Sequence, residues 1–109
     1  MANIRKNFDS YKVQCTGSRR DLPLASISCY EGATWVGLLE FWADPARVRE
    51  PFVWNERIVL SYTLDRFGDI VDILRNEKPL ELYLNPSGKW GSLLTKEAEP
   101  VGEGEPVGG

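Results

Sequence analysis

Residues 57–85 read RIVLSYTLDRFGDIVDILRNEKPLELYLN, and the period of their apolar residues changes twice. From Arg57 to Leu64 the residues alternate as in a half-buried strand. From Asp65 the apolar residues follow the i, i+3, i+4, i+7 spacing of an amphipathic helix, and after Pro79 the alternation returns. This stretch therefore predicts a strand, a helix and a strand. The apolar residues of the predicted helix are Phe67, Ile70, Val71 and Leu74.

Both ends of the predicted helix carry residues that helices favour there. Thr63 or Asp65 can cap its start, and Asp69 lies near the positive end of the helix dipole. Arg75 and Lys78 lie near the negative end. The charges thus support the helix that the apolar spacing predicts.

Further strands are predicted on both sides of this stretch. After it, residues 85–88 (NPSG) form a turn, and residues 89–95 form a last strand. Residues 44–56 contain two prolines and no clear period, so we expect an extended connection anchored by Phe52 and Trp54. Three strands are also predicted before this connection. Alternation predicts two of them, over residues 11–16 and 25–30, and residues 34–43 follow as a long strand that is apolar on both faces.

Together these elements predict an α+β domain. Hairpin-length connections join antiparallel neighbours, and a single amphipathic helix must bury its apolar stripe against one face of a sheet. We therefore expect a curved antiparallel β-sheet, in the order β-β-β-β-α-β-β, with one helix packed on one face. At 109 residues the chain holds one such domain, over residues 1–95.

The composition changes at the C-terminal end. Glu99 to Gly109 reads EPVGEGEPVGG and contains no aromatic residue. Such a segment cannot bury enough apolar surface to fold, so we expect residues 96–109 to be a flexible acidic tail. Residues 1–95 contain twelve basic and twelve acidic residues, so the net charge of −3 belongs to this tail.

The residue types that are missing exclude several chemistries. The chain has no histidine, which removes the commonest general base and the commonest zinc ligand. Cys15 and Cys29 have no CxxC partner, so we expect no metal site and no cofactor. The simplest interpretation of both cysteines is a buried strand thiol, and a disulfide between them is the alternative. An enzyme with either cysteine as nucleophile therefore ranks last among the functions considered.

The first residues and the hydropathy bear on location. Met1 to Asp9 reads MANIRKNFD, which has no apolar h-region and no small-residue cleavage site. Nowhere does the chain reach the run of about 18 apolar residues that a spanning helix needs. We therefore expect a cytoplasmic protein that does not contact a membrane.

The sheet face opposite the helix is the main candidate for binding. By alternation it should carry uncharged polar groups and aromatic rings, which suit base stacking or many weak peptide contacts. The candidate binding residues on it are Tyr30, Trp42 and Tyr83. The same rings could instead form cross-strand packing pairs or contacts with a partner subunit.

Two loops add arginines to the candidate residues. Arg19 and Arg20, within residues 17–23 (GSRRDLP), could contact phosphates together with neighbouring backbone amides. Arg47 and Arg49 form a second basic spot. Because no GK[ST] follows the glycine, the first loop does not match a phosphate-binding P-loop. The alternative for all four is a solvated loop charge.

The order of elements resembles one group of binding proteins. Four strands and a helix, ending at Leu74, are similar to the ββββα unit of small PUR-type regulators, a resemblance that implies binding of single-stranded nucleic acid. We expect a non-enzymatic binding module whose open sheet face or edge engages a protein partner or a single-stranded nucleic acid. The structural alternative is an assembly protein whose aromatic face is only a homodimer interface.

Overall fold

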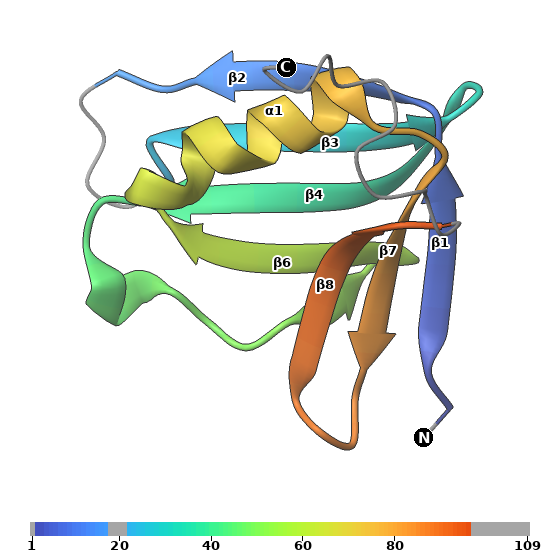
Figure 1. Cartoon of the computed structure of the whole chain (residues 1–109). Helices are drawn as coiled ribbons and strands as arrows, with labels where there is room; N and C mark the ends of the chain where they lie inside the picture. The colour runs from blue at the N-terminus through green and yellow to red at the C-terminus, as the bar shows by residue number, and fades with distance from the viewer. Residues whose placement is uncertain (1, 18–21, 97–109) are drawn as a thin grey trace, which may run out of the picture.

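The computed structural model describes residues 2–17 and 22–96, which form two β-sheets and one α-helix (Figure 1). The predicted α+β fold with a single helix on one face of a sheet is confirmed. The expected tail from residue 97 onward, and Arg19 and Arg20, lie outside the described residues.

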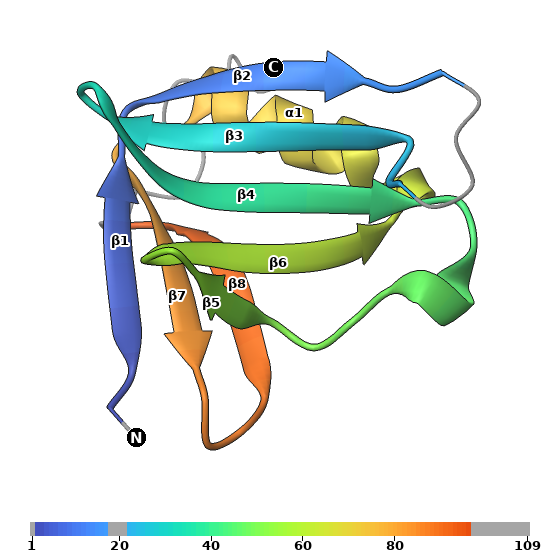
Figure 2. The ribbon, with the colours of Figure 1, turned by 180° about the vertical axis from the view of Figure 1, so that it is seen from behind.

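The larger sheet has five strands in the order β2-β3-β4-β6-β5. Neighbouring strands pair antiparallel, except that β4 and β6 run parallel. Figures 1 and 2 show this sheet from its two sides. Its strands are β2 (Ser10–Cys15), β3 (Ala25–Glu31), β4 (Thr34–Trp42), β5 (Phe52–Trp54) and β6 (Arg57–Thr63).

The parallel pair corrects the expectation of a wholly antiparallel sheet. Its cause is the segment 43–56, which is too long for a hairpin and carries the chain back along the sheet edge before β6 begins. This segment contains the 3-10 turn η1 (Pro45–Arg47) and strand β5, where we expected only an extended connection. Asn55 and Glu56, at φ values of 47° and 66°, form the two-residue turn of the β5–β6 hairpin.

The smaller sheet has three antiparallel strands in the order β1-β7-β8. The β7–β8 hairpin was predicted, whereas β1 is an additional strand. Only Asp9 separates β1 from β2, and there the chain passes between the sheets, since Phe8 pairs with Leu80 and Ser10 pairs with Tyr30 (Figure 2). The three strands are β1 (Ile4–Phe8), β7 (Leu80–Asn85) and β8 (Trp90–Thr95).

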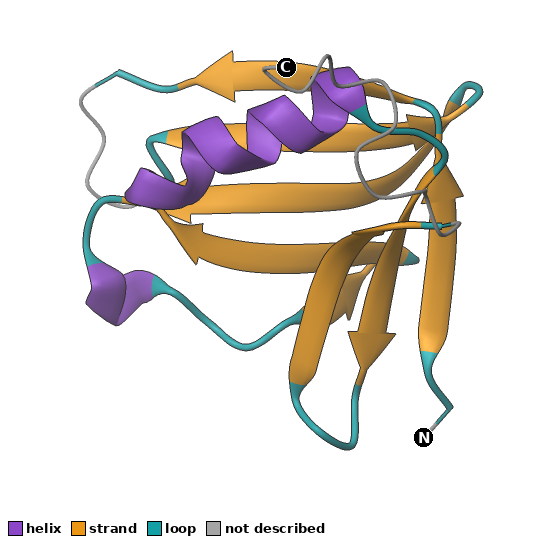
Figure 3. Cartoon of the chain, in the orientation of Figure 1, coloured by secondary structure: helices purple, strands orange, loops and turns teal. Residues whose placement is uncertain are grey.

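The helix covers one face of the larger sheet (Figure 3). It buries Ile70 and Leu74 against that face. The Phe41 ring has no exposed surface there, stacks on Tyr62 with centroids 5.5 Å apart, and meets the Phe67 ring edge-on at 5.1 Å. In the described part of the chain, no helix is long and apolar enough to cross a membrane. The helix is α1 (Phe67–Asn76), preceded by the 3-10 turn η2 (Leu64–Arg66).

The two sheets approach each other closely at two glycines. A Cβ atom at Gly37 of β4 would overlap the Cδ1 methyl of Leu82 in β7. A Cβ atom at Gly91 of β8 would lie 2.6 Å from Leu60 Cδ2 and 2.8 Å from the Tyr83 carbonyl oxygen. The contact between the sheets therefore depends on the absence of a side chain at these positions.

Candidate functional site

The face of the larger sheet opposite α1 has no helix over it among the described residues (Figure 2). Strand register shows which residues share this face, because directly paired residues point to the same side of a sheet. One row of paired residues crosses all five strands and consists of Lys12, Ser28, Leu38, Val59 and Phe52. This row and nine further residues on the same side of the sheet are called the uncovered face from here on. The nine residues are Gln14, Ser26, Tyr30, Trp35, Glu40, Trp42, Trp54, Arg57 and Ser61.

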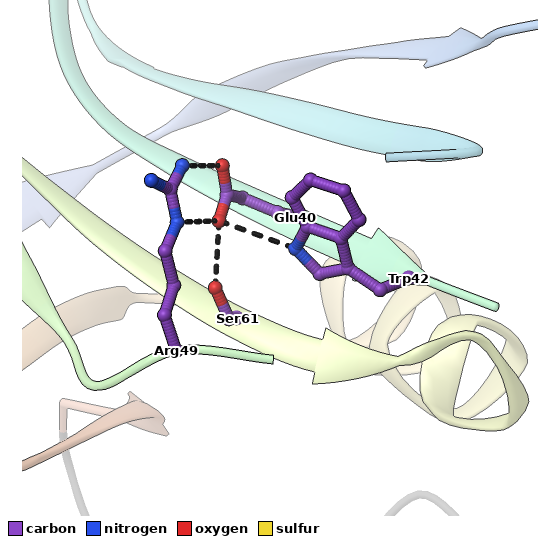
Figure 4. Close-up of polar contacts among 4 residues, drawn as sticks. All are labelled: Glu40, Trp42, Arg49 and Ser61. Atoms are coloured by element: carbon purple, nitrogen blue, oxygen red, sulfur yellow. Dashed lines mark hydrogen bonds and ion pairs between the residues drawn. The ribbon is translucent and has the colours of Figure 1, made fainter. Parts of the chain in front are cut away.

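Glu40 is a buried charge on the uncovered face, with 3% of its surface exposed. The Arg49 guanidinium donates two hydrogen bonds to it, from Nε to Oε1 at 2.9 Å and from Nη2 to Oε2 at 2.5 Å. Ser61 Oγ and Trp42 Nε1 also donate to Oε1, at 2.6 Å and 3.4 Å (Figure 4). Donors from β4, β6 and the segment after β4 thus converge on one carboxylate.

These contacts keep the Glu40 carboxylate ionised. Burial alone would raise its pKa, but the hydrogen bonds from Arg49 and Ser61 and the charge of Arg49 lower the pKa below the ordinary value of 4.5. The hydrogen bond to Glu40 in turn raises the pKa of Arg49. A carboxylate that stays ionised and fully hydrogen-bonded is a poor general acid at neutral pH. The pair instead fixes the segment after β4 against the sheet.

Near the β5–β6 hairpin, the Arg57 guanidinium contacts two indole rings. Its Cζ atom lies 3.9 Å from the ring centroid of Trp35 and 5.2 Å from that of Trp54. The two indoles meet edge to face, with centroids 5.5 Å apart. Trp35 is held by a hydrogen bond from Nε1 to the Gly37 carbonyl oxygen at 2.8 Å, whereas Trp54 is 44% exposed. Such stacking fixes the guanidinium plane and removes part of its hydration.

Arg57 forms no ion pair with another residue of the described ranges. Its Nε atom is buried and has no hydrogen-bond acceptor among them, while the residue as a whole keeps partial exposure. A buried donor without an acceptor is unfavourable, and most buried polar groups in proteins are paired. Arg57 is thus a pre-oriented cation on the uncovered face.

A hollow of about 290 Å³ lies next to Trp54. Apolar side chains of β4, β5 and β6 supply most of its lining, and the Arg49 guanidinium lies 4.7 Å from the Phe52 ring centroid at its edge. An apolar lining with a few fixed polar groups is the usual composition of a binding pocket. The lining residues are Leu38, Glu40, Arg49, Phe52, Trp54 and Val59.

A second hollow, of about 420 Å³, lies at the C-terminal end of α1. It is bounded by residues 8–11, residues 74–78 and Leu80. Of the charged residues that line it, Asp9, Arg75 and Lys78 are exposed to water and Glu77 is half-buried. Exposed charges are solvated and give little directed binding energy. We therefore place the candidate site on the uncovered face.

Two of the predicted aromatic residues lie on the uncovered face. Tyr30 carries the Lys12 ammonium 5.4 Å from its ring centroid. Trp42 is only 8% exposed and donates to Glu40, so it supports the buried network and offers little free ring surface.

The other predicted residues do not join this face. Tyr83 lies in the smaller sheet, which corrects the expectation that it shares a face with Tyr30. Its ring is 8% exposed and contacts the Arg5 guanidinium at 4.8 Å and the Trp90 ring at 5.0 Å. Arg19 and Arg20, for which phosphate contacts were expected, lie outside the described residues.

The cluster of Trp35, Trp54 and Arg57 was not predicted from the sequence. A signal was present, since Asn55 is a residue that favours the two-residue turn of a hairpin. Recognising this turn would have placed Trp54 opposite Arg57, as the register shows. The contact with Trp35 crosses from β6 to β4 and leaves no local pattern in the sequence.

The two cysteines lie on neighbouring strands but far from each other. Cys15 pairs with Ala25 and Cys29 pairs with Tyr11, so about 13 Å of strand separates them. Both are free thiols, and Cys29 is buried whereas Cys15 is exposed. This corrects the expectation that both are buried and removes the disulfide alternative.

Alkylation of the native protein should therefore modify one thiol quickly. Cys15 is accessible, whereas burial raises the pKa of the Cys29 thiol to about 12 and shields it from reagent. Intact mass after iodoacetamide treatment should show one adduct in native buffer and two in urea. Cys15→Ser should lose the fast adduct. Equal native rates for both thiols would contradict the burial of Cys29.

The uncovered face offers stacking, apolar and cationic groups. Within the described residues, no three histidine, cysteine, aspartate or glutamate side chains are grouped so that they could hold a metal ion. Comparison of the chain with family models, with curated proteins and with solved structures gives no match.

Proposed function

We propose that this chain is a non-enzymatic binding module that recognises a segment of another protein on its uncovered face. The observation that carries the proposal is the stack of Trp35, Arg57 and Trp54 in contact with the 290 Å³ hollow. Tryptophan and arginine are among the residues most enriched where protein interfaces gain their binding energy. On this face they are pre-oriented, which lowers the entropy lost on binding.

The surroundings of the stack support the same use. Ser26 and Ser28 of β3 are uncharged polar residues of the face, and Glu40 is neutralised by Arg49. Interfaces between proteins have this composition, with few net charges near an aromatic centre. Residues 1–95 are neutral in sum, which favours a protein over a polyanion as partner.

Single-stranded nucleic acid is a second candidate, favoured by one observation. Among the described residues of the uncovered face, three cations each lie over one or more rings: Lys12 over Tyr30, Arg49 over Phe52, and Arg57 over the two indoles. Aromatic rings interleaved with cations are the usual platform for unpaired bases.

Selection from a random peptide display library tests the protein-binding proposal. Wild-type protein as bait should enrich peptides, and Trp54→Ala should bind the synthesised peptides at least about tenfold more weakly, because a central indole is lost. Trp90→Ala is the matched control, since Trp90 is 49% exposed, close to the 44% of Trp54, but lies on the smaller sheet. Isothermal titration calorimetry gives the affinities.

Three outcomes would overturn this proposal. The first is a selection that enriches no peptide, or peptides that bind Trp54→Ala as tightly as wild type. The second is saturable, salt-dependent quenching of tryptophan fluorescence by a single-stranded oligonucleotide, lost in Trp54→Ala, which would identify nucleic acid as the ligand. The third is a dimeric mass in light scattering that Trp54→Ala makes monomeric, which would assign the face to self-association.

A further inference from the structure

We infer that the uncovered face selects a partner segment in which a carboxylate lies next to a large apolar side chain. Arg57 binds the carboxylate, and the hollow beside Trp54 takes the apolar side chain. This inference rests on the proposed function and adds the chemistry of the partner to it.

The internal ion pairs of the protein show what an arginine in this setting binds. Arg5 and Arg49 each lie over an aromatic ring, and each pairs with a buried carboxylate, Glu81 and Glu40 respectively. Arg57 lies over two rings, yet pairs with no carboxylate of the described residues. A stacked guanidinium is weakly hydrated and planar, so it suits the two parallel hydrogen bonds that a carboxylate accepts. Among the arginines that the structure describes over an aromatic ring, Arg57 is therefore the one available to a partner.

The apolar half of the segment follows from the position of Trp54. The same indole contacts the Arg57 guanidinium and lines the hollow, whose other apolar lining residues are Leu38, Phe52 and Val59. A ligand that fills both places must therefore carry its carboxylate and its apolar group close together. An acidic residue adjacent to an aromatic or large aliphatic residue meets this requirement.

The charges near Arg57 favour a single anion over a chain of phosphates. Arg49, which also lines the hollow, is already paired with Glu40. Lys12 lies on β2, at the far edge of the sheet from β5. A polyanion gains affinity by neutralising several phosphates at once, whereas Arg57 is the unpaired cation that the described residues place beside this hollow.

N-acetylphenylalanine and its amide form a matched pair of probes. They share the aromatic group and differ in the carboxylate. In ¹⁵N-labelled full-length protein, the acid should shift the indole N–H signals of Trp35 and Trp54 and the Nε–H signal of Arg57. The amide should bind about tenfold more weakly, because the two charge-assisted hydrogen bonds are lost.

Variants assign the preference to one residue. Arg57→Gln should bind acid and amide equally, since it keeps a polar side chain but loses the charge. Arg47→Gln removes an exposed charge on η1 and should keep the wild-type preference. The amide N–H spectrum of each variant shows whether the fold is retained.

The outcomes separate this inference from the proposed function. Equal binding of acid and amide at Trp54 would overturn the role of the carboxylate and leave the binding face in place. No shift with either probe would overturn the inference as a whole, while the peptide selection still decides the proposed function. Inorganic phosphate and acetate are tested in the same way. If phosphate shifts the Arg57 Nε–H signal and acetate does not, the inference of a carboxylate is overturned in favour of a phosphate ligand.

Discussion

Gly37→Ala should lower the free energy of unfolding by about 1–3 kcal/mol, which is the usual effect of an extra methyl group in a filled core. The added Cβ would overlap the Cδ1 methyl of Leu82 and lie 3.3 Å from the Ile58 carbonyl oxygen. Leu82 and Ile58 have no exposed surface, so neither can move toward solvent to make room. Urea unfolding followed by tryptophan fluorescence measures the loss.

A double-mutant cycle with Leu82→Ala tests where the loss comes from. Leu82→Ala alone should cost about 2–5 kcal/mol, because it leaves a cavity between the sheets. In the double variant the new methyl group of residue 37 enters that cavity. The double variant should therefore be more stable than the sum of the single losses predicts, by about 0.5–3 kcal/mol.

Gly68→Ala is the control for this cycle. A Cβ at Gly68 would meet nothing within 4 Å, and the residue lies in α1, where alanine is favoured over glycine by about 0.5–1 kcal/mol. This variant should be at least as stable as wild type. Additive losses in the Gly37 and Leu82 cycle would contradict the close approach of the two sheets. If Gly37→Ala alone does not fold, folding of the double variant still supports the close approach of the two sheets at residues 37 and 82.

The fold was predictable where the apolar period is regular. The strand, helix and strand of residues 57–85 were confirmed because each buries one face, and burial produces a period. Strand β1 was missed because Arg5, Lys6 and Asn7 separate its two apolar residues, and its position depends on pairing with β7, far along the chain. The parallel pairing of β4 and β6 is likewise set by tertiary contacts.

The candidate site was predictable only in part, because tertiary contacts that leave no period in the sequence also set part of it. Alternation placed Tyr30 and Trp42 on the face opposite the helix. It gave no reason to expect a buried carboxylate at Glu40, which lies in an otherwise apolar strand. Burial of Glu40 depends on Arg49 and Ser61, which follow nine and twenty-one residues later. Contacts of this kind are set by the fold and leave no periodic pattern.

Glu40→Gln should lower the free energy of unfolding at pH 7 by about 1.5–3 kcal/mol, the usual value of hydrogen bonds to a charged group. The amide keeps an acceptor for Ser61 but loses the two-bond pair with Arg49. We expect no larger loss, because the Arg49 side chain is 53% exposed and water can solvate its charge when the partner is gone. Trp54 and the hollow should be affected too, since Arg49 holds the segment that leads to β5.

The loss of unfolding free energy in Glu40→Gln should depend on pH, and the direction of this dependence follows from the pKa of Glu40. The folded protein holds this pKa below the ordinary value of 4.5, so the ionised carboxylate stabilises the fold above that pH. As the pH falls through the folded pKa, wild-type protein protonates Glu40 and loses this contribution, whereas Glu40→Gln has nothing to lose. The difference in unfolding free energy between the two proteins should therefore shrink as the pH falls from 5 toward 2, about the range over which such carboxylates titrate.

Glu31→Gln is the control, because Glu31 is an exposed carboxylate at the end of β3. Its unfolding free energy should follow that of wild type at every pH, within the roughly 0.5 kcal/mol usual for surface substitutions. Urea unfolding of all three proteins across the pH range gives the comparison. Comparing variants at one pH cancels the titration of the other acidic residues, which all three share. A Glu40→Gln loss that stays constant with pH would mean that shape alone, and not the charge of the carboxylate, fixes the segment after β4 against the uncovered face.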